Sequence, residues 1–217
     1  MTAIGIIGNG PQNYPDFAPF KEEIDFWIAA DRGALALLDH NIPIDLAIGD
    51  FDSITEVEKE HVRLHAKQFE EYPAEKDETD LELALLKALE KHPERLYLFG
   101  VTGGRLDHEM INIQLLHTIT ENGVHGMIVD QSNLVELYKP GEYTVESSAL
   151  YANISFIPFS PTIKGLTLNG FYYPLSDKTV AWGSTLCISN RLIRNIGTFS
   201  FTEGILLLIK SRDTIQR

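Results

Sequence analysis

The pattern of apolar and polar residues divides the chain into two halves of different character. Up to about residue 130, short apolar runs alternate with segments of helical period. Helices are predicted over 80–91 and 107–121, where apolar residues recur at intervals of three and four. Strands that alternate with helices predict a mainly parallel, doubly wound α/β sheet with helices on both faces. The apolar runs that predict strands are 3–7, 25–30, 45–49, 67–72, 95–101 and 125–130.

The second half has period-two character and predicts strands alone. Short alternating runs are separated there by Gly, Pro, Asn and Ser. We therefore predict an all-β sandwich or small barrel, with a boundary near Asn133 to Gly141, where KPGEY supplies a turn. The predicted domains are residues 1–132 and residues 133–217. The runs that predict strands are YTVESS, LYANISFIP, IKGLTLNG, STLCISN, TFSFTEG and ILLLIK.

The charge balance restricts the classes of partner. The 217 residues include 31 acidic and 18 basic ones, which gives a formal net charge of -13. This balance argues against nucleic acid or anionic lipid held on a broad basic surface, so an anionic substrate would need a metal ion or a few well-placed basic residues. No apolar run near the C-terminus is long enough to span a bilayer, and the one cysteine, Cys187, cannot form an internal disulfide. We expect a cytoplasmic protein with no membrane or nucleic-acid partner.

The first candidate for chemistry follows the third predicted strand. Ligands of a parallel α/β sheet bind beyond the carboxyl ends of its strands. In GDFDS, Asp50 and Asp52 are two residues apart, and in an extended segment their carboxylates would face one volume ~6–7 Å apart. Two carboxylates this close repel unless a proton or a cation lies between them, and Mg²⁺ accepts such oxygen ligands. The alternative is a polar turn in which Asp52 or Ser53 caps a helix that begins near Thr55.

The next strand end, in KDETD, also has two interpretations. Asp77 is a candidate for the N-cap of the following helix, with Asp80 at the third helical position. Alternatively, Asp80 completes a three-carboxylate metal set with the GDFDS pair, and Lys76 contacts phosphate.

The stretch VTGGRLDH carries the features of a phosphate site. Gly103 and Gly104 let the backbone approach a ligand closely. Arg105 offers a planar fork that suits phosphate oxygens. Asp107 begins a predicted helix whose first N–H groups favour an anion. An exposed arginine beside a Gly-Gly turn is common, so this stretch gains weight only beside the other strand ends.

Taken in order, four motifs resemble the motif series of the thiamine pyrophosphokinase family in its bacterial form. They are ADRGA (30–34), IGDFDSI (48–54), KDETDLELAL (76–85) and VTGGRLDHEMIN (101–112). The match continues through GLTLNGFYYPL (165–175) and GSTLCISN (183–190), so it covers nearly the whole chain.

The resemblance implies an enzyme of two domains that works as a homodimer, with active sites formed between subunits. The α/β half would bind the nucleotide, and the β half would bind thiamine and form the dimer. The reaction would be a Mg²⁺-dependent transfer of pyrophosphate from ATP to the hydroxyl of thiamine, giving thiamine diphosphate and AMP. ATP would thus be a co-substrate and Mg²⁺ the cofactor.

The resemblance also implies roles for individual residues. The carboxylates for Mg²⁺ and the phosphates would be Asp50, Asp52 and Asp80. Tyr173 would stack on thiamine, with Ser189 and Asn190 also in contact with it. From the chemistry of this reaction, Arg105 can neutralise charge on the polyphosphate, and we nominate Asp107 or Asp80 to take the proton of the hydroxyl. Other ATP-binding positions would be Asp31, Lys76, Asp77, Thr79, Gly103, Gly104, Arg105, Asp107 and His108.

Two other functions remain as alternatives. A phosphatase of the haloacid dehalogenase type would use Asp50 as the phosphorylated nucleophile and Asp52 as the acid, although that motif normally follows the first strand. A non-catalytic module that senses nucleotide or metal would bind ATP without turnover. AMP that forms only with thiamine would separate the kinase from both.

Overall fold

The computed structural model of the chain describes residues 2–11 and 13–213. Internal contacts divide the chain into two compact units, Met1–Gln131 and Ser132–Arg217. This division alone does not test the nucleotide-binding and thiamine-binding roles predicted for the two halves.

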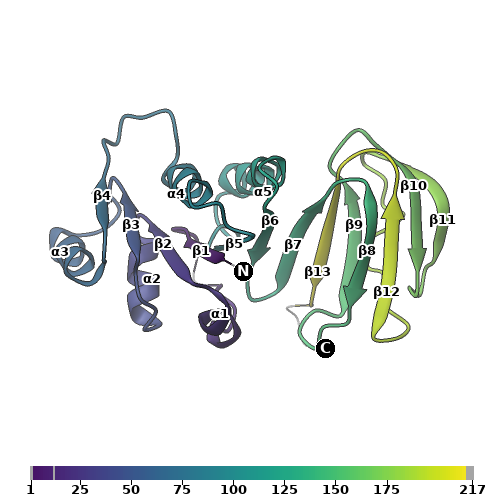
Figure 1. Cartoon of the computed structure of the whole chain (residues 1–217), viewed down its shortest axis with the longest axis horizontal. Coiled ribbons are helices and arrows are strands. Elements are labelled where there is room, and N and C mark those ends of the chain that lie inside the picture. The colour runs from purple at the N-terminus through teal and green to yellow at the C-terminus, as the bar shows by residue number, and fades with distance from the viewer. Residues whose placement is uncertain (1, 12, 214–217) are drawn as a thin grey trace. The chain divides into compact units, whose positions relative to one another are not determined.

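The first unit is an α/β domain built on a parallel sheet (Figure 1). Its strands lie in the order β4-β3-β2-β1-β5-β6, and every recorded pairing among them is parallel. All six predicted strands are present, and the α/β class with a mostly parallel sheet is confirmed. The strands are β1 (Ala3–Ile7), β2 (Phe26–Ala30), β3 (Leu46–Gly49), β4 (Phe69–Glu71), β5 (Arg95–Phe99) and β6 (His125–Val129).

Helices lie on both sides of this sheet. Figure 1 shows α4 and α5 on one side of the strands and α1 and α2 on the other. Among the described residues, no helix combines the length and apolar character that a membrane span requires. The helices are α1 (Ala18–Glu23), α2 (Gly33–Asp39), α3 (Glu56–His65), α4 (Asp80–Leu89) and α5 (Leu106–Glu121).

The burial of the strands explains why their sequences are continuously apolar. Every residue of β1 and of β3 is buried, because helices on both faces remove water from both sides of a parallel sheet. The strand ends, not the strand interiors, are therefore left to carry polar side chains.

The helix caps differ from those considered in the sequence. Thr55 caps α3 in a capping box with Glu58, so neither Asp52 nor Ser53 is the cap. Thr79 caps α4, and its hydroxyl accepts a hydrogen bond from the backbone N–H of Glu82. The proposed cap at Asp77 is therefore wrong, because the helix begins at Asp80. A threonine hydroxyl reaches the third N–H of the helix as well as a carboxylate would.

Gly33 allows the start of α2 to pack against the end of β1. A Cβ built at this position would lie 2.3 Å from the carbonyl oxygen of Ile7. In an open helix, Gly→Ala would stabilise the fold by about 1 kcal/mol. We expect Gly33→Ala to lower the free energy of unfolding instead, by about 1–3 kcal/mol, because backbone must move. Urea unfolding measures this change, and a stabilised variant would contradict it.

The second unit consists of two antiparallel sheets around one apolar core. One sheet has the order β7-β13-β9 and the other β11-β10-β12-β8. Phe156 of one sheet and Phe199 of the other lie with ring centroids 5.1 Å apart in this core. This is the arrangement of a β-sandwich. The strands are β7 (Asn133–Tyr138), β8 (Gly141–Glu146), β9 (Asn153–Pro158), β10 (Thr162–Asn169), β11 (Leu175–Ala181), β12 (Ile196–Phe201) and β13 (Leu206–Ser211).

One predicted strand of this unit is wrong and two strands were missed. STLCISN forms turns in which Ser189 has a φ of 57°, and its one recorded β-bridge with β9 joins Asn190 to Ile154. Of its three consecutive apolar residues, Cys187 is buried, whereas Leu186 and Ile188 are exposed. The missed strands are β7 and β11. Between β7 and β8, KPGEY supplies the predicted turn.

Candidate active site

A cavity of about 520 Å³ opens at the carboxyl ends of the strands of the first unit. Its walls come from the segments that follow β1, β2, β3, β4 and β5 and from the first turns of α4 and α5. The predicted site residues that line it are Asp31, Asp50, Lys76, Thr79, Asp80, Gly104, Arg105 and His108. Four residues predicted for the same site do not line it: Asp52, Asp77, Gly103 and Asp107.

Asp50 and Asp52 lie close together, but not through the extended geometry that the sequence analysis assumed. Phe51 between them has the left-handed φ of 57°, and the Asp52 N–H donates to Asp50 Oδ1 at 3.1 Å. Phe51 is 2% exposed and stacks on Phe69, with ring centroids 4.5 Å apart. Burial of this aromatic ring thus offsets the cost of an unusual backbone and turns both carboxylates to one side.

Asp31 joins this pair to form a cluster of three carboxylates. One oxygen from each of Asp31, Asp50 and Asp52 lies within 4.8 Å of the other two. Asp31 also has a left-handed backbone, at φ 51°, and a Cβ on the neighbouring Gly49 would come within 3.1 Å of it. The parallel pairing of β2 with β3 brings these strand ends side by side.

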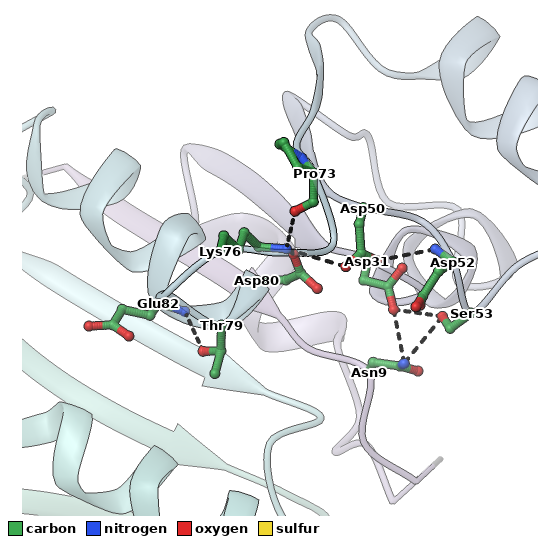
Figure 2. Close-up of polar contacts among 10 residues, drawn as sticks. All are labelled: Asn9, Asp31, Asp50, Asp52, Ser53, Pro73, Lys76, Thr79, Asp80 and Glu82. Carbon is green, nitrogen blue, oxygen red and sulfur yellow. Dashed lines mark hydrogen bonds and ion pairs between the residues drawn. The ribbon is translucent and has the colours of Figure 1, made fainter.

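The hydrogen bonds of Asp31 leave one oxygen for a ligand. Asp31 is 6% exposed, and its Oδ2 accepts from Ser53 Oγ at 2.6 Å and from Asn9 Nδ2 at 3.1 Å (Figure 2). Among the described residues, its Oδ1 has no hydrogen-bond partner although it is buried. A buried carboxylate oxygen without a partner is costly, and a cation would satisfy it. The cluster therefore fits a hard divalent ion such as Mg²⁺.

Repulsion within the cluster changes the acidity of its members. The charge of Asp50 raises the pKa of Asp52, and lost hydration and Asp31 raise it further. Burial alone would raise the pKa of Asp50, but hydrogen bonds from the Asp52 N–H and from Lys76 outweigh it, so this pKa is lowered. A cation in the cluster would relieve the repulsion on Asp52.

Lys76 separates Asp80 from the cluster. Its Nζ lies 3.0 Å from Asp80 Oδ1 and 3.3 Å from Asp50 Oδ2. Figure 2 shows the Lys76 side chain extending toward both carboxylates, with Asp52 beyond Asp50. Burial raises the pKa of Asp80, and Lys76 offsets only part of this effect. The metal set predicted from the sequence contained Asp80, whereas the structure groups Asp31 with the GDFDS pair.

Arg105 and Asp107 pair with each other at the start of α5. The guanidinium donates to the carboxylate through Nε at 3.1 Å and Nη2 at 2.5 Å, and both side chains are largely exposed. These hydrogen bonds lower the pKa of Asp107 to about 2. Arg105 is the N-cap residue of α5 and Asp107 is the second helical residue, so the helix begins at Leu106. The other face of Arg105 borders the cavity.

The candidate thiamine residues of the second unit have different surroundings. Tyr173 is 59% exposed, and its ring meets that of Tyr172 edge to face, with centroids 4.9 Å apart. Asn190 is 2% exposed, and its side-chain amide bonds to backbone groups. Its Oδ1 accepts from the N–H groups of Tyr173 and Arg191, and its Nδ2 donates to the Tyr173 carbonyl oxygen. Ser189 is exposed. The amide of Asn190 thus joins the backbone of Tyr173 to that of Arg191.

Two family models match the chain in order. One is described as thiamin pyrophosphokinase, catalytic domain, and matches residues 17–128. The other is described as thiamin pyrophosphokinase, vitamin B1 binding domain, and matches residues 142–206. The chain belongs to the thiamine pyrophosphokinase family.

Relatives within the thiamine pyrophosphokinase family match this chain from end to end. The thiamine pyrophosphokinase of Bacillus subtilis (strain 168) is 47% identical, over 98% of this chain and 100% of that protein. A crystal structure of the B. subtilis protein has a TM-score of 0.92 at 45% identity, covering 98% of this chain and 100% of that one. A crystal structure of the Geobacillus thermodenitrificans thiamin pyrophosphokinase has a TM-score of 0.88 at 42% identity, covering 98% of this chain and 99% of that one. The resemblance stated from the motifs is confirmed.

Several residues that line the cavity were not predicted from the sequence. Asn9 borders the cavity and bonds to Asp31, and Asn112 borders it from α5. Asn9 follows the first strand, so the rule that ligands bind beyond the strand ends, which led to Asp31 and Asp50, applies to it as well. Other lining residues that were not predicted are Gly8, Gly10, Pro11, Ala30, Ala74, Glu78, Leu81, Gly100, Val101, Thr102 and Glu109.

The two helix caps provide a matched test of the role of Thr79. Thr79→Ala and Thr55→Ala should each lower the free energy of unfolding by about 1 kcal/mol, because each removes an N-cap hydroxyl. Only Thr79 lines the cavity and begins the helix that carries Asp80. We therefore expect a raised KM for ATP in Thr79→Ala alone. Equal kinetics in the two variants would contradict this role.

Proposed function

We propose that the chain transfers the pyrophosphoryl group of ATP to the hydroxyl of thiamine, giving thiamine diphosphate and AMP. The observation that carries this proposal is the match of both thiamin pyrophosphokinase family models, in order, along one chain. The catalytic model covers all the segments that line the acidic cavity except the one following β1.

The sheet topology supports a nucleotide in this cavity. Strand order reverses at β1, from which the chain proceeds outward to β4 on one side and to β6 on the other. We infer a doubly wound sheet, in which ligands bind at the carboxyl ends where the order reverses. The segments after β1 and β5, which include Gly10 and Gly104, border the cavity at that point. The polyphosphate of ATP would lie there, near the first turns of α4 and α5.

The acidic cluster is the proposed place for Mg²⁺. Asp31, Asp50 and Asp52 would hold the ion, because their oxygens converge and Asp31 has a buried oxygen without a partner. When bound, Mg²⁺ would neutralise charge on the phosphate oxygens. Asp80 would then act on the substrate side of the cavity rather than on the ion.

The remaining polar residues of the cavity have proposed roles in positioning and proton transfer. Arg105 would hold phosphate oxygens with the part of its guanidinium that Asp107 does not engage. Of the two candidate bases, Asp80 is the better one, because it lines the cavity and burial raises its pKa. Asp107 lies outside the lining, and Arg105 lowers its pKa to about 2. Lys76, Thr79 and His108 would border the nucleotide, as the resemblance implies.

The second unit would supply the thiamine contacts. Tyr173 presents an exposed ring that suits stacking on a cationic heterocycle. Asn190 would fix the backbone of that tyrosine, and Ser189 would be within the same segment.

We further propose a homodimer with active sites formed between subunits and a location in the cytoplasm, the latter supported by a single buried cysteine.

The order of addition tests this function. Mg-ATP is titrated first and thiamine second, with AMP followed throughout. The proposal expects AMP to form only after thiamine is added, in equal amount to thiamine diphosphate. Binding of ATP without AMP would instead favour the non-catalytic sensing module.

The phosphatase alternative has no support in the matched family models, both of which describe thiamin pyrophosphokinase. Release of inorganic phosphate from phosphomonoesters by the chain would support the phosphatase alternative.

A further inference from the structure

Lys76 is built into the site between two carboxylates. Its ammonium lies 3.0 Å from Asp80 Oδ1 and 3.3 Å from Asp50 Oδ2, and it donates to the Pro73 carbonyl oxygen at 3.2 Å. Two of these contacts are hydrogen bonds, to Asp50 and to the Pro73 carbonyl, and the contact with Asp80 is an ion pair, since Asp80 Oδ1 has no hydrogen-bond partner among the described residues. The side chain is 12% exposed, and Figure 2 shows it beside Pro73, Asp50 and Asp80.

The acidic residues of the site therefore form two sets that share Asp50. One set is Asp31, Asp50 and Asp52, whose oxygens converge within 4.8 Å. Within the described part of the chain, neither Asp31 nor Asp52 forms an ion pair. The other set is Asp50 and Asp80, with the Lys76 ammonium between them. The first set lacks a cation of its own, and the second already contains one.

We propose that Lys76 is a permanent cation of the site, which takes the place of a second divalent ion between Asp50 and Asp80. The chain then binds one divalent ion, at Asp31, Asp50 and Asp52, and Asp80 is not among its ligands. Two positive charges a few ångströms apart repel strongly in a partly desolvated cavity, so the ammonium excludes a second ion. The inference deepens the proposed function, from which it takes the need for a divalent ion.

A consequence is that loss of the ammonium opens a new site. Lys76→Gln leaves Asp50 and Asp80 facing each other without a cation, and a divalent ion is then favoured between them. Removing Asp80 as well takes away one of the two carboxylates. The double variant Lys76→Gln with Asp80→Asn should therefore lose the second ion again.

The test is a titration with Mn²⁺ alone, without nucleotide, in which electron paramagnetic resonance measures the free ion. We expect one Mn²⁺ per wild-type chain, two for Lys76→Gln, and one for the double variant. Asp80→Asn should bind one ion with an affinity within about threefold of wild type. Asp50→Asn should weaken binding about tenfold or more.

Three results would overturn the proposal, and the third is two Mn²⁺ ions bound by the wild-type chain. The first is a single Mn²⁺ in a folded Lys76→Gln variant, as judged by circular dichroism. The second is an Asp80→Asn variant as weak as Asp50→Asn, and this comparison decides the matter if Lys76→Gln does not fold. AMP formation by the wild-type chain is measured separately. A wild-type chain that makes AMP but binds two Mn²⁺ ions would refute the single ion and leave the proposed function standing.

Discussion

Asp50→Asn should reduce thiamine-dependent AMP formation by about a hundredfold or more while the fold is retained. Asp50 belongs to the carboxylate cluster and also accepts from Lys76, so the change weakens both sources of positive charge near the polyphosphate. The side chain keeps its shape, and Asn can still accept the Asp52 N–H. The measurement is kcat with saturating Mg-ATP and thiamine, together with a thermal melt.

Glu56→Gln is the matched control for this variant. It removes the same charge from an exposed position in the first turn of α3, outside the residues that line the cavity. The control should have near wild-type kcat, because exposed charges are screened by salt. Asp52→Asn should behave like Asp50→Asn. Normal turnover in both aspartate variants would refute the assignment of GDFDS as the metal platform.

Asn190→Ala should have the largest effect in the second unit, with a loss of about 2–5 kcal/mol of unfolding free energy. The buried amide makes three hydrogen bonds to the backbone of Tyr173 and Arg191, and truncation leaves those groups without partners. Because Tyr173 loses its anchor, KM for thiamine should rise as well. Urea unfolding and thiamine kinetics measure the two effects.

Ser189→Ala separates positioning from direct contact. This neighbour keeps its own backbone bond, in which its N–H donates to Ser155 Oγ at 3.0 Å. Its unfolding free energy should change by less than about 0.5 kcal/mol. If Asn190→Ala raised KM without loss of stability, Asn190 would be a direct ligand of thiamine and the positioning role would be wrong.

The sequence predicted the parallel half well because its strands are buried on both faces. Runs such as residues 3–7 are apolar throughout, and no other element of this length produces that pattern between helices. The short helices α1 and α2 were not predicted, since six and seven residues give too few repeats of the helical period. In the second half, STLCISN was predicted as a strand, but Leu186 and Ile188 beside the buried Cys187 are exposed, which the sequence does not reveal.

The sequence predicted where in the fold the site lies, but not which of its side chains meet. The rule that ligands bind at strand ends found Asp31, Asp50 and Lys76. Which carboxylates meet depends on strand order, and only the pairing of β2 with β3 brings Asp31 to the GDFDS turn. The left-handed backbone of Phe51 was also hidden, because it follows from tertiary stacking on Phe69.

The carboxylate cluster is assembled from two strand ends that are distant in the sequence. In the unfolded chain, Asp31 does not stay beside Asp50 and Asp52, so a divalent ion would bind the native state almost alone. Binding of this kind adds roughly 2.7 kcal/mol to the free energy of unfolding when the free ion is at a hundred times its Kd. With the proposed ion at this cluster, a higher concentration of divalent cations would thus lengthen the survival of the first unit in heat, denaturant and proteases, quite apart from its effect on turnover.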